Sequence, residues 1–386
     1  MTYSSKTTVY LDNAASSFPK PTAVVNKVAA MLRTNTANAG RSGHRLSQQA
    51  AEEIFAARTT VSEFFGISGS EENVVFTSSA TQAINTVLKG LDLKGRHIII
   101  SDLEHNSVYR PTVYLAKSGV YGDIARVSNN DDETVENFKK LIRHNTALIF
   151  VTHASNVTGK ILPIKKLGRL CKERGILFGV DASQTAGHMD IDMKNDNIDI
   201  LCTSGHKGLF GPQGTGLLIV NGDIKIAPLL HGGTGSSSLL AEQPMLLPES
   251  LESGTMNAAG IAGLAEGIKF IEKNKAAFRK KEQALFEKAY DGLMNIDGVT
   301  IFSPRTNNAH VIAFSVDDLH SDTITSLLDE RCVCVRGGFH CAALCHRKLK
   351  TEKNGLVRVS MNGFNTESDI VFFLKALRTS IDTARN

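Results

Sequence analysis

Short apolar runs alternate with longer amphipathic stretches through the first two thirds of the chain. The short runs predict buried strands, and the stretches with apolar residues three or four positions apart predict helices. The expected strands are Val74–Thr77, His97–Ile100, Ala147–Val151, Ile176–Val180, Ile198–Cys202 and Leu217–Val220. Alternating strands and helices are typical of an α/β fold with a largely parallel sheet, which we expect to be flanked by helices.

The pattern changes near residue 260. A charged amphipathic helix is expected over Ile268–Leu293, and a last helix after Thr366, where Thr366 and Asp369 can form an N-cap pair. Between them the expected strands are Val299–Phe302, His310–Val316, Cys332–Val335 and Leu356–Ser360. This pattern predicts a smaller C-terminal α+β domain. We expect a large domain over residues 15–260, and a small one formed by residues 1–14 and 261–386.

Composition narrows the function classes. The 386 residues are 42% hydrophobic, enough for a large core. The net charge of +4 comes from 43 basic and 39 acidic residues scattered along the chain, which argues against a nucleic-acid partner. No apolar run reaches transmembrane length, and Met1–Val9 lacks the hydrophobic core of a signal peptide. We therefore expect a cytoplasmic protein without a membrane partner, whose six cysteines are mostly reduced.

A lysine follows one of the buried strands. Lys207 lies among small and hydroxyl residues just after the run Ile198–Cys202. It is either a solvated loop residue or a lysine that forms a Schiff base with pyridoxal 5′-phosphate (PLP), a role that requires a desolvated amine.

An aspartate ends the preceding strand. Asp181 follows Ile176–Val180, and a carboxylate at the end of a buried strand is costly unless it is paired. A protonated pyridine nitrogen would be such a partner, and Gln184 could reach the phenolic oxygen of the same cofactor. Asp181 and Lys207 at the ends of successive strands are the arrangement that PLP chemistry requires, because ligands gather at the carboxyl ends of such strands.

Three further loops carry polar groups. The stretch through Ala80 and Thr81 joins a strand to a helix, so it is either a phosphate site or an ordinary Ser/Thr helix cap. His105 follows the strand His97–Ile100 and is either a surface residue or a ring that stacks on a pyridine. Asn156 could donate its amide to the cofactor or to a substrate carboxylate.

Together these motifs resemble those of class V aminotransferase-fold proteins. The matching stretches are Asp12-Asn13-Ala14-Ala15, Glu104-His105, Ser155-Asn156, Asp181-x-x-Gln184, Ser204-x-His206-Lys207 and Glu252-Ser253-Gly254-Thr255. The stretch Arg336–Ala342, which contains His340 and Cys341, resembles the cysteine desulfurase and selenocysteine lyase family, in particular its type II, SufS-like branch. The resemblance covers nearly the whole chain and implies the PLP-dependent transferase fold type I.

The resemblance also implies roles for the matching residues. Lys207 would hold the cofactor and move the Cα proton, Asp181 would pair with the pyridinium, and His105 would stack on the ring. The phosphate would be held by the backbone of Ala80 and by Thr81, Ser204, His206 and, from a second subunit, Thr255, so a homodimer is implied. Asn156 and Arg358 would bind the substrate carboxylate, Arg336 would position the substrate or the cysteine loop, and Cys341 would accept sulfur.

The implied reaction converts L-cysteine to L-alanine and leaves a Cys341 persulfide for an acceptor protein. His340 and Arg336 are expected to favour the Cys341 thiolate through positive charge. A selenocysteine lyase acting on L-selenocysteine and a class V transaminase remain alternatives. A non-catalytic scaffold is disfavoured because Lys207 and Asp181 are both present.

The sequence departs from the family pattern at two places. Ala80 stands where the family often has a second Thr. An additional pair, Cys345 and His346, follows Cys341, so that six Cys and His residues fall within the fifteen residues 332–346. A zinc site is therefore an alternative for this region, although we expect no metal. Cys345 could otherwise be a resolving thiol, a relay thiol or a spacer. Because residues 347–354 are polar and basic, the Cys341 loop is expected to be exposed and mobile.

Overall fold

The structure is a computed structural model that describes residues 8–40, 42–235 and 238–385. Its contacts divide the chain into two compact units. The larger unit comprises Lys20–His153 and Leu162–Lys273, and the smaller comprises Met1–Pro19, Ala154–Ile161 and Asn274–Asn386. The division in sequence falls inside helix α7 (Ala258–Met294). The domain boundary near residue 260 stays a prediction.

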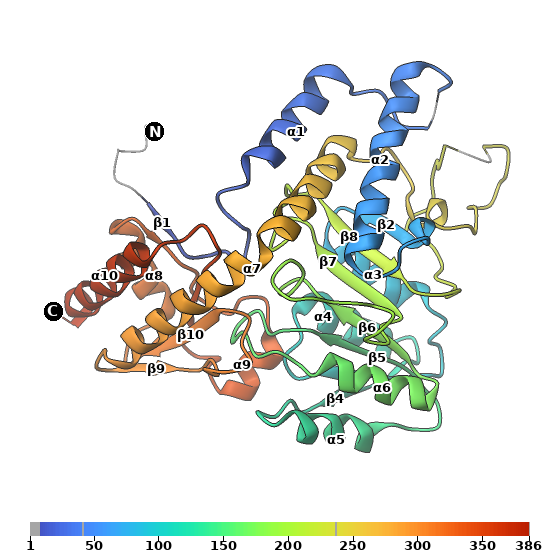
Figure 1. Ribbon diagram of the computed structural model, residues 1–386. Coiled ribbons are helices and arrows are strands. Elements are labelled where there is room, and N and C mark those ends of the chain that lie inside the picture. The colour runs from blue at the N-terminus through green and yellow to red at the C-terminus, as the bar shows by residue number, and fades with distance from the viewer. Residues whose placement is uncertain (1–7, 41, 236–237, 386) are drawn as a thin grey trace. The chain divides into compact units, whose positions relative to one another are not determined.

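A seven-stranded sheet forms the centre of the larger unit (Figure 1). The strand order is β2-β8-β7-β6-β5-β3-β4, and all neighbours are parallel except β8, which is antiparallel to both β2 and β7. The strands are β2 (Val74–Thr77), β3 (His97–Ser101), β4 (Tyr121–Ala125), β5 (Thr146–Thr152), β6 (Leu177–Asp181), β7 (Ile200–Ser204) and β8 (Gly216–Val220). The predicted mixed, mostly parallel sheet is confirmed, with each of the six predicted strands within two residues of its observed ends.

The strand β4 was absent from the prediction for a physical reason. It lies at the edge of the sheet, and most of its residues are exposed or half-buried, so its sequence Tyr-Gly-Asp-Ile-Ala carries no apolar run. Ile98, Ile99 and Ile100 of β3, by contrast, are fully buried. Strands that are covered on both faces have the continuous apolar sequence that makes them recognisable.

Helices flank this sheet (Figure 1). These helices have one apolar and one polar face; in α6, for example, the apolar residues Ile164, Leu167 and Leu170 are buried. Gly175 ends α6 in a left-handed conformation with φ of 63°. The helical elements are α1 (Thr22–Thr34), α2 (Arg45–Phe64), η1 (Glu71–Asn73), α3 (Ala80–Gly90), α4 (Asn106–Ala116), α5 (Asp131–Leu141), α6 (Ile164–Arg174), η2 (Glu249–Leu251) and the first part of α7.

The smaller unit contains two short sheets. An antiparallel sheet has the order β12-β10-β9, and β1 pairs in parallel with β11. The elements are β1 (Val9–Tyr10), β9 (Val299–Ile301), β10 (Val311–Val316), α8 (Ser321–Glu330), β11 (Val333–Cys334), α9 (Ala343–Leu349), β12 (Val357–Ser360) and α10 (Glu367–Arg385). The predicted α+β character of this region is therefore correct.

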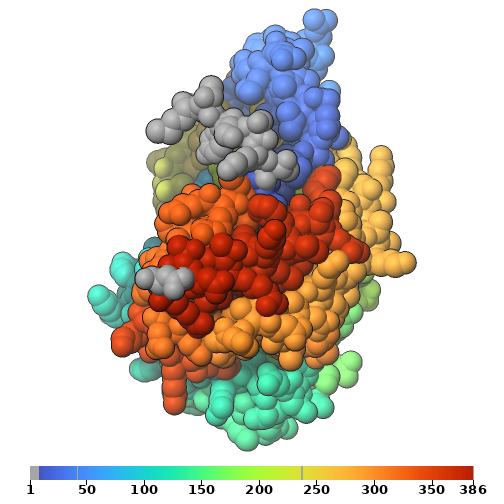
Figure 2. Space-filling view, turned by 90° about the vertical axis from the view of Figure 1, so that its left-hand side faces the viewer, coloured from blue at the N-terminus to red at the C-terminus, as the bar shows by residue number. Residues whose placement is uncertain are grey.

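The core of the smaller unit is shared by α7, α8, α10 and the strands. Phe314 of β10 and Phe373 of α10 are both fully buried in it. The predicted N-cap pair is present, because Thr366 N–H donates to Asp369 Oδ2 at 2.9 Å and Asp369 N–H donates to Thr366 Oγ1 at 3.3 Å. The outer side of α10 lies at the surface, as Figure 2 shows in red. Within the described ranges, no helix has both the length and the apolar character needed to cross a membrane.

Candidate active site

Asp181 and Lys207 lie at the same edge of the large sheet. Asp181 is the last residue of β6 and is buried, and it pairs with Cys202 on the neighbouring parallel strand β7. Lys207 follows the end of β7 by three residues. The Asp181 carboxylate accepts the Ser183 N–H at 2.9 Å, and no basic side chain among the described residues forms an ion pair with it. A buried carboxylate in this setting suits a cationic partner such as a protonated pyridine nitrogen, so the residues fit PLP at this point.

Two glycines allow the Lys207 loop to approach the segment after Asp181. A Cβ atom at Gly208 would lie 2.3 Å from the carbonyl oxygen of Ala186. A Cβ atom at Gly187, where φ is 90°, would lie 2.1 Å from the carbonyl oxygen of Gly208. Any side chain at either position would push the two segments apart. The glycine next to the lysine therefore positions it close to the segment that follows Asp181.

His206 is neutral in the folded protein. Burial, followed by the charges of Lys207 and Lys20, lowers its pKa to about 4. Lys20 also donates its ammonium to the carbonyl oxygen of His206 at 2.8 Å. A neutral imidazole can hold a phosphate by donating a hydrogen bond. Ser204, also expected at the phosphate, donates its hydroxyl to Ser183 Oγ at 3.3 Å.

The N-terminus of α3 carries open donors. Ser79 is the N-cap and its Oγ accepts the N–H of Gln82 at 3.2 Å. The N–H groups of Ala80 and Thr81 have no acceptor in the part of the chain that the structure describes. These donors and the helix dipole fit an anion, as the sequence predicts for a phosphate.

A buried ion pair that the sequence analysis missed anchors the segment before Thr255. Arg58 of α2 binds Glu252 through both of its terminal nitrogens, and Glu252 Oε1 also accepts the Phe76 N–H at 2.7 Å. The Arg58 guanidinium also lies 4.8 Å from the centre of the Phe76 ring. Ser78 and Thr255 of this chain line one cavity of about 220 Å³. Only the matched Glu252 motif could have pointed to this segment, because nothing local in the sequence marks Arg58.

His105 is the N-cap of α4, and its ring is fixed in place. Its Nδ1 accepts the N–H of Ser107 at 3.1 Å and lies 2.8 Å from Ser107 Oγ. The preceding residue, Glu104, is fully buried and accepts the N–H of Thr152 at 2.9 Å and 3.0 Å through its two oxygens. Burial, with a contribution from the charge of Asp181, raises the pKa of Glu104 to about 8. Glu104 therefore ties the loop that carries His105 to the end of β5.

The smaller unit contains a buried arginine, Arg358. Arg358 of β12 is 1% exposed; its Nη2 donates to Asp12 Oδ1 and its Nη1 to the carbonyl oxygen of Asn156, at 2.7 Å and 2.8 Å. Its Nε is buried and has no acceptor among the described residues. Burial lowers the pKa of Arg358, while the charge of Asp12 opposes that effect. The remaining donors of this guanidinium suit a second carboxylate.

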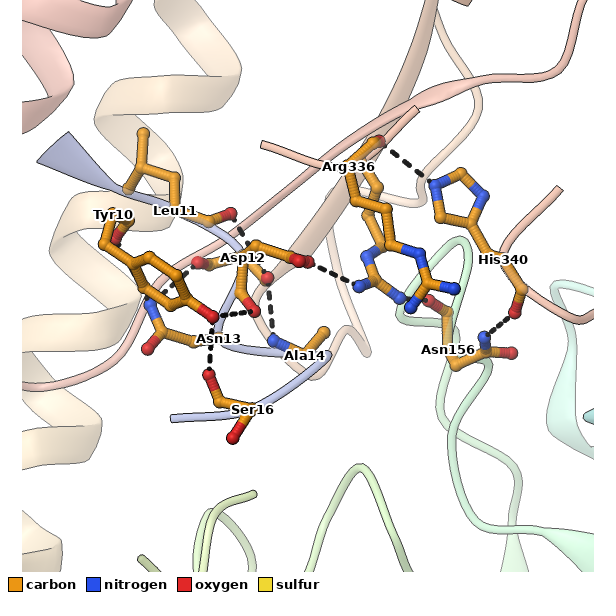
Figure 3. A network of polar contacts seen from close by, with 11 residues as sticks. Tyr10, Leu11, Asp12, Asn13, Ala14, Ser16, Asn156, Arg336 and His340 are labelled. Carbon is orange, nitrogen blue, oxygen red and sulfur yellow. Dashed lines mark hydrogen bonds and ion pairs between the residues drawn. The ribbon is translucent and has the colours of Figure 1, made fainter. Parts of the chain in front are cut away.

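The N-terminal arm holds Asp12 in place (Figure 3). The Tyr10 hydroxyl donates to the carbonyl oxygens of Ser16 and Asp12 at 2.9 Å and 3.2 Å. The N–H of Ala14 donates to Ser360 Oγ at 2.8 Å, which joins the arm to the end of β12. The matched Asp-Asn-Ala-Ala motif is thus the partner of Arg358, a contact that the sequence analysis did not predict.

Asn156 and Arg336, both labelled in Figure 3, each form hydrogen bonds with Arg358. Asn156 Nδ2 donates to the carbonyl oxygen of His340 at 2.6 Å, and its Oδ1 is buried without a partner among the described residues. The backbones of Arg336 and Arg358 bond to each other in both directions, at 3.2 Å and 2.8 Å. The three residues predicted to bind or position substrate are therefore brought together within the smaller unit.

Cys341 is exposed on a tight turn. Both His340 and Cys341 have positive φ, 50° and 55°, and the N–H of Ala342 donates to the carbonyl oxygen of Phe339 at 3.0 Å. His340 is buried, and desolvation followed by the charge of Arg358 lowers its pKa to about 2. The expected positive charge on His340 is therefore wrong, since the imidazole is neutral. Of the two expected cations only Arg336 remains.

The zinc alternative finds no support in the structure. Among the described residues there is no group of three or more His, Cys, Asp or Glu side chains that could hold a metal ion. Cys332 and Cys334 are half-buried, whereas Cys345 is fully buried in α9.

The fold and the two sets of side chains define a class. The fold is that of the PLP-dependent transferases of fold type I, and the chain belongs to the aminotransferase class-V family, whose model matches residues 9–373. Its relatives within that family include cysteine desulfurases. A probable cysteine desulfurase of Pyrococcus abyssi is 34% identical over 98% of this chain and 95% of its own length.

Solved structures agree with this assignment. A cysteine desulfurase from Thermococcus onnurineus superposes with a TM-score of 0.89 at 32% identity, covering 97% of this chain and 95% of the other. The cysteine desulfurase CsdA from Escherichia coli superposes with a TM-score of 0.86 at 26% identity, with the same coverage.

The raised pKa of Glu104 predicts a pH-dependent stability. Between about pH 5 and pH 8 the folded protein retains a proton on Glu104 that the unfolded chain has lost, so the free energy of unfolding falls as pH rises. Glu104→Gln removes this slope. As pH rises from 5 to 8, the free energy of unfolding of the variant should increase by roughly 1–3 kcal/mol relative to that of the unmodified protein. Denaturant unfolding at each pH measures this difference. Glu72→Gln, at an exposed position, is the control; parallel stability curves for Glu104→Gln and the unmodified protein would contradict the assignment.

The ion pair of Asp12 with Arg358 predicts a second stability effect. Asp12→Ala leaves a buried guanidinium without its carboxylate and should destabilise the protein by about 2–4 kcal/mol. The double variant Asp12→Ala/Arg358→Met should recover much of the lost free energy of unfolding, because no uncompensated buried charge remains. Thermal and denaturant unfolding measure the stability of the single and the double variant, and Asp382→Ala, at an exposed position, is the control. Additive losses in the double variant would show that the pair does not act as a unit.

Proposed function

We propose that the protein is a PLP-dependent cysteine desulfurase that converts L-cysteine to L-alanine and holds the sulfur as a persulfide on Cys341. The observation that carries the proposal is the network around Arg358, in which Asn156 joins the carboxylate-binding side chains to the residue immediately before Cys341. A transaminase would need the arginine but not an exposed cysteine on that turn. The similarity to cysteine desulfurases over nearly the full chain supports the same reaction.

The proposed cofactor is PLP, which when bound supplies an electron sink for the substrate Cα. Asp181 would pair with its pyridinium and Lys207 would form the Schiff base. His105, held by Ser107, would cover the ring, and Gln184 would reach the phenolic oxygen. The residues proposed to hold the phosphate are Ala80 and Thr81 through the start of α3, Ser204, His206 and Thr255.

The chain's own residues would then divide the reaction between them. Arg358 and Asn156 bind the substrate carboxylate, which orients Cα, and Lys207 takes the Cα proton. The Cys341 thiolate attacks the substrate sulfur, so that a sulfur–sulfur bond forms as the bond from Cβ to sulfur breaks. Protonation at Cβ completes alanine. The Cys341 persulfide is then open to an acceptor protein, because this side chain is exposed.

Two finer proposals accompany the reaction. We infer a homodimer in which Thr255 reaches the phosphate of the partner subunit, as the Glu252–Thr255 motif suggests. L-Selenocysteine is the alternative substrate, because it differs from L-cysteine by one atom at the position that Cys341 attacks.

The assignment of Lys207 has a direct chemical test. The purified protein should be yellow, and borohydride reduction should fix the cofactor to one lysine, because reduction makes a Schiff base irreversible. Peptide mapping should find it on Lys207, and Lys207→Ala should lose the covalent cofactor while remaining folded. Lys20, whose ammonium bonds the backbone of His206, is the matched control lysine. Cofactor bound to any lysine other than Lys207 would contradict the assignment.

Cys341→Ala tests the function itself. The variant should keep its cofactor and still change its absorbance when L-cysteine binds, but alanine and sulfide production should fall at least about tenfold, because the nucleophile is gone. Turnover of L-selenocysteine should survive better, since the carbon–selenium bond is weaker. Cys334→Ala, a half-buried thiol in β11, is the control. Unchanged turnover of L-cysteine by Cys341→Ala would remove the proposed mechanism.

A further inference from the structure

Two thiols lie on one short stretch of the smaller unit. Cys341 is exposed on the turn before α9, and Cys345 is fully buried in the first turn of that helix. Neither forms a disulfide in this structure. The proposed function uses Cys341 only, so Cys345 is a buried nucleophilic group still without a role.

The stretch that carries the two thiols is fixed at both ends by neighbouring residues. Asn156 Nδ2 donates to the carbonyl oxygen of His340, the residue before Cys341, at 2.6 Å. Ser155 Oγ lies 3.9 Å from Cys345 Sγ. The Cα atoms of Ser155 and Asn156 are about 3.8 Å apart, because they are consecutive in the chain. The sulfur of Cys345 therefore lies beside Ser155, and the next residue, Asn156, holds the backbone before Cys341.

The turn between the thiols is strained. His340 and Cys341 both occupy the left-handed region, which non-glycine residues rarely adopt. Such a conformation persists only while surrounding contacts hold it. Here they include the bond from Asn156 to His340 and the contact of 3.2 Å between His340 Nε2 and the carbonyl oxygen of Arg336. Opening of these contacts would allow the turn to relax.

Two neutral histidines adjoin the pair of thiols. The rings of His340 and His346 stack with their centres 5.8 Å apart and an interplanar angle of 10°. His340 Nδ1 and His346 Nε2 are buried, and neither has a hydrogen-bond partner within the described part of the chain. Burial lowers the pKa of both imidazoles, so each is neutral near pH 7 and has a nitrogen lone pair. A thiol is a nucleophile only after it loses its proton, and His346 is the residue next to Cys345.

We infer that Cys345 is a resolving thiol for the persulfide on Cys341, an inference that rests on the proposed function. Cys345 attacks the inner sulfur of the persulfide, so the Cys341–Cys345 disulfide forms as the bond between Cys341 sulfur and the outer sulfur breaks. The outer sulfur leaves as hydrogen sulfide with the persulfide proton and the Cys345 proton. The Cys345 sulfur is oxidised and the departing sulfur is reduced, while the Cys341 sulfur stays at the disulfide level, so no outside oxidant is needed. A dithiol reductant then restores both thiols.

The leaving groups decide which sulfur of the persulfide Cys345 attacks. Attack on the outer sulfur would expel the Cys341 thiolate, whereas attack on the inner sulfur expels hydrosulfide, which is the weaker base. The weaker base leaves faster in thiol exchange. In the absence of an acceptor, the chain would therefore discharge free sulfide and become oxidised, rather than retain its persulfide.

The test uses the holoenzyme and one equivalent of L-cysteine per active site, without added thiol. Trypsin cleaves after Arg336 and Arg347, so both thiols fall in a single peptide, residues 337–347. We expect the unmodified protein to give this peptide two hydrogen atoms lighter, together with one equivalent each of alanine and sulfide. Cys345→Ala and Cys345→Ser should form alanine at the same first-turnover rate, but the peptide should be one sulfur atom heavier, and sulfide should appear at least about tenfold more slowly.

The outcomes separate this inference from the proposed function. Absence of alanine from both the unmodified protein and Cys345→Ala would overturn the proposed function and the inference with it. Alanine formation with a heavier peptide in the unmodified protein, as long-lived as in Cys345→Ala, would overturn the inference alone. Extra sulfur mapped to Cys345 by peptide fragmentation would also overturn it, in favour of a relay. Cys334→Ala, outside this peptide, is the matched control and should behave as the unmodified protein.

Discussion

The charge of Arg358 imposes the constraint on which the candidate substrate site depends. A guanidinium that is 1% exposed must be neutralised and hydrogen-bonded, because an unpaired buried cation is very costly. The chain supplies the carboxylate of Asp12 from the N-terminal arm and the carbonyl oxygen of Asn156 from the segment Ala154–Ile161. Three stretches far apart in sequence therefore converge on one side chain. The arm is ordered where it meets Arg358, and the same convergence brings Asn156 to the turn that carries Cys341.

The larger unit also buries ionisable groups, but there the buried groups are carboxyl groups instead of a guanidinium. Asp181 is buried at the end of β6 and accepts a backbone N–H, but no basic side chain of the described residues pairs with it. Glu104, buried nearby in the same unit, resolves its own burial by keeping a proton, as its raised pKa shows. Asp181 lies at the sheet edge beside the lysine loop, where a cationic ring can pair with it. One carboxyl group thus holds a loop in place as a neutral acid, while the other is the proposed partner of the cofactor.

The sequence predicted those features that depend on local pattern. Buried strands such as β3 were recognisable because both of their faces are covered, whereas the edge strand β4 was not. Asp181 and Lys207 were found because each follows such a strand. The pairing of Asp12 with Arg358 and of Arg58 with Glu252 is set by tertiary contacts between residues 346 and 194 positions apart, which no local pattern records. The neutrality of His340 is of the same kind, because it depends on burial and on the charge of Arg358.

The two glycines before Cys341 limit where the turn can move. A Cβ atom at Gly337 would lie 2.6 Å from Thr325 Oγ1, and a Cβ atom at Gly355 would lie 2.9 Å from Gly338 Cα. Gly338 also donates its N–H to Ser321 Oγ at 3.1 Å, so this end of the motif is packed against α8. Helix α9 fixes the other end. Movement is therefore confined to the few residues around His340 and Cys341, whose left-handed backbone is held by Asn156. On so short a turn the proposed sulfur carrier has a small reach, so any acceptor in the proposed reaction, whether another protein or Cys345, must come close to the turn itself.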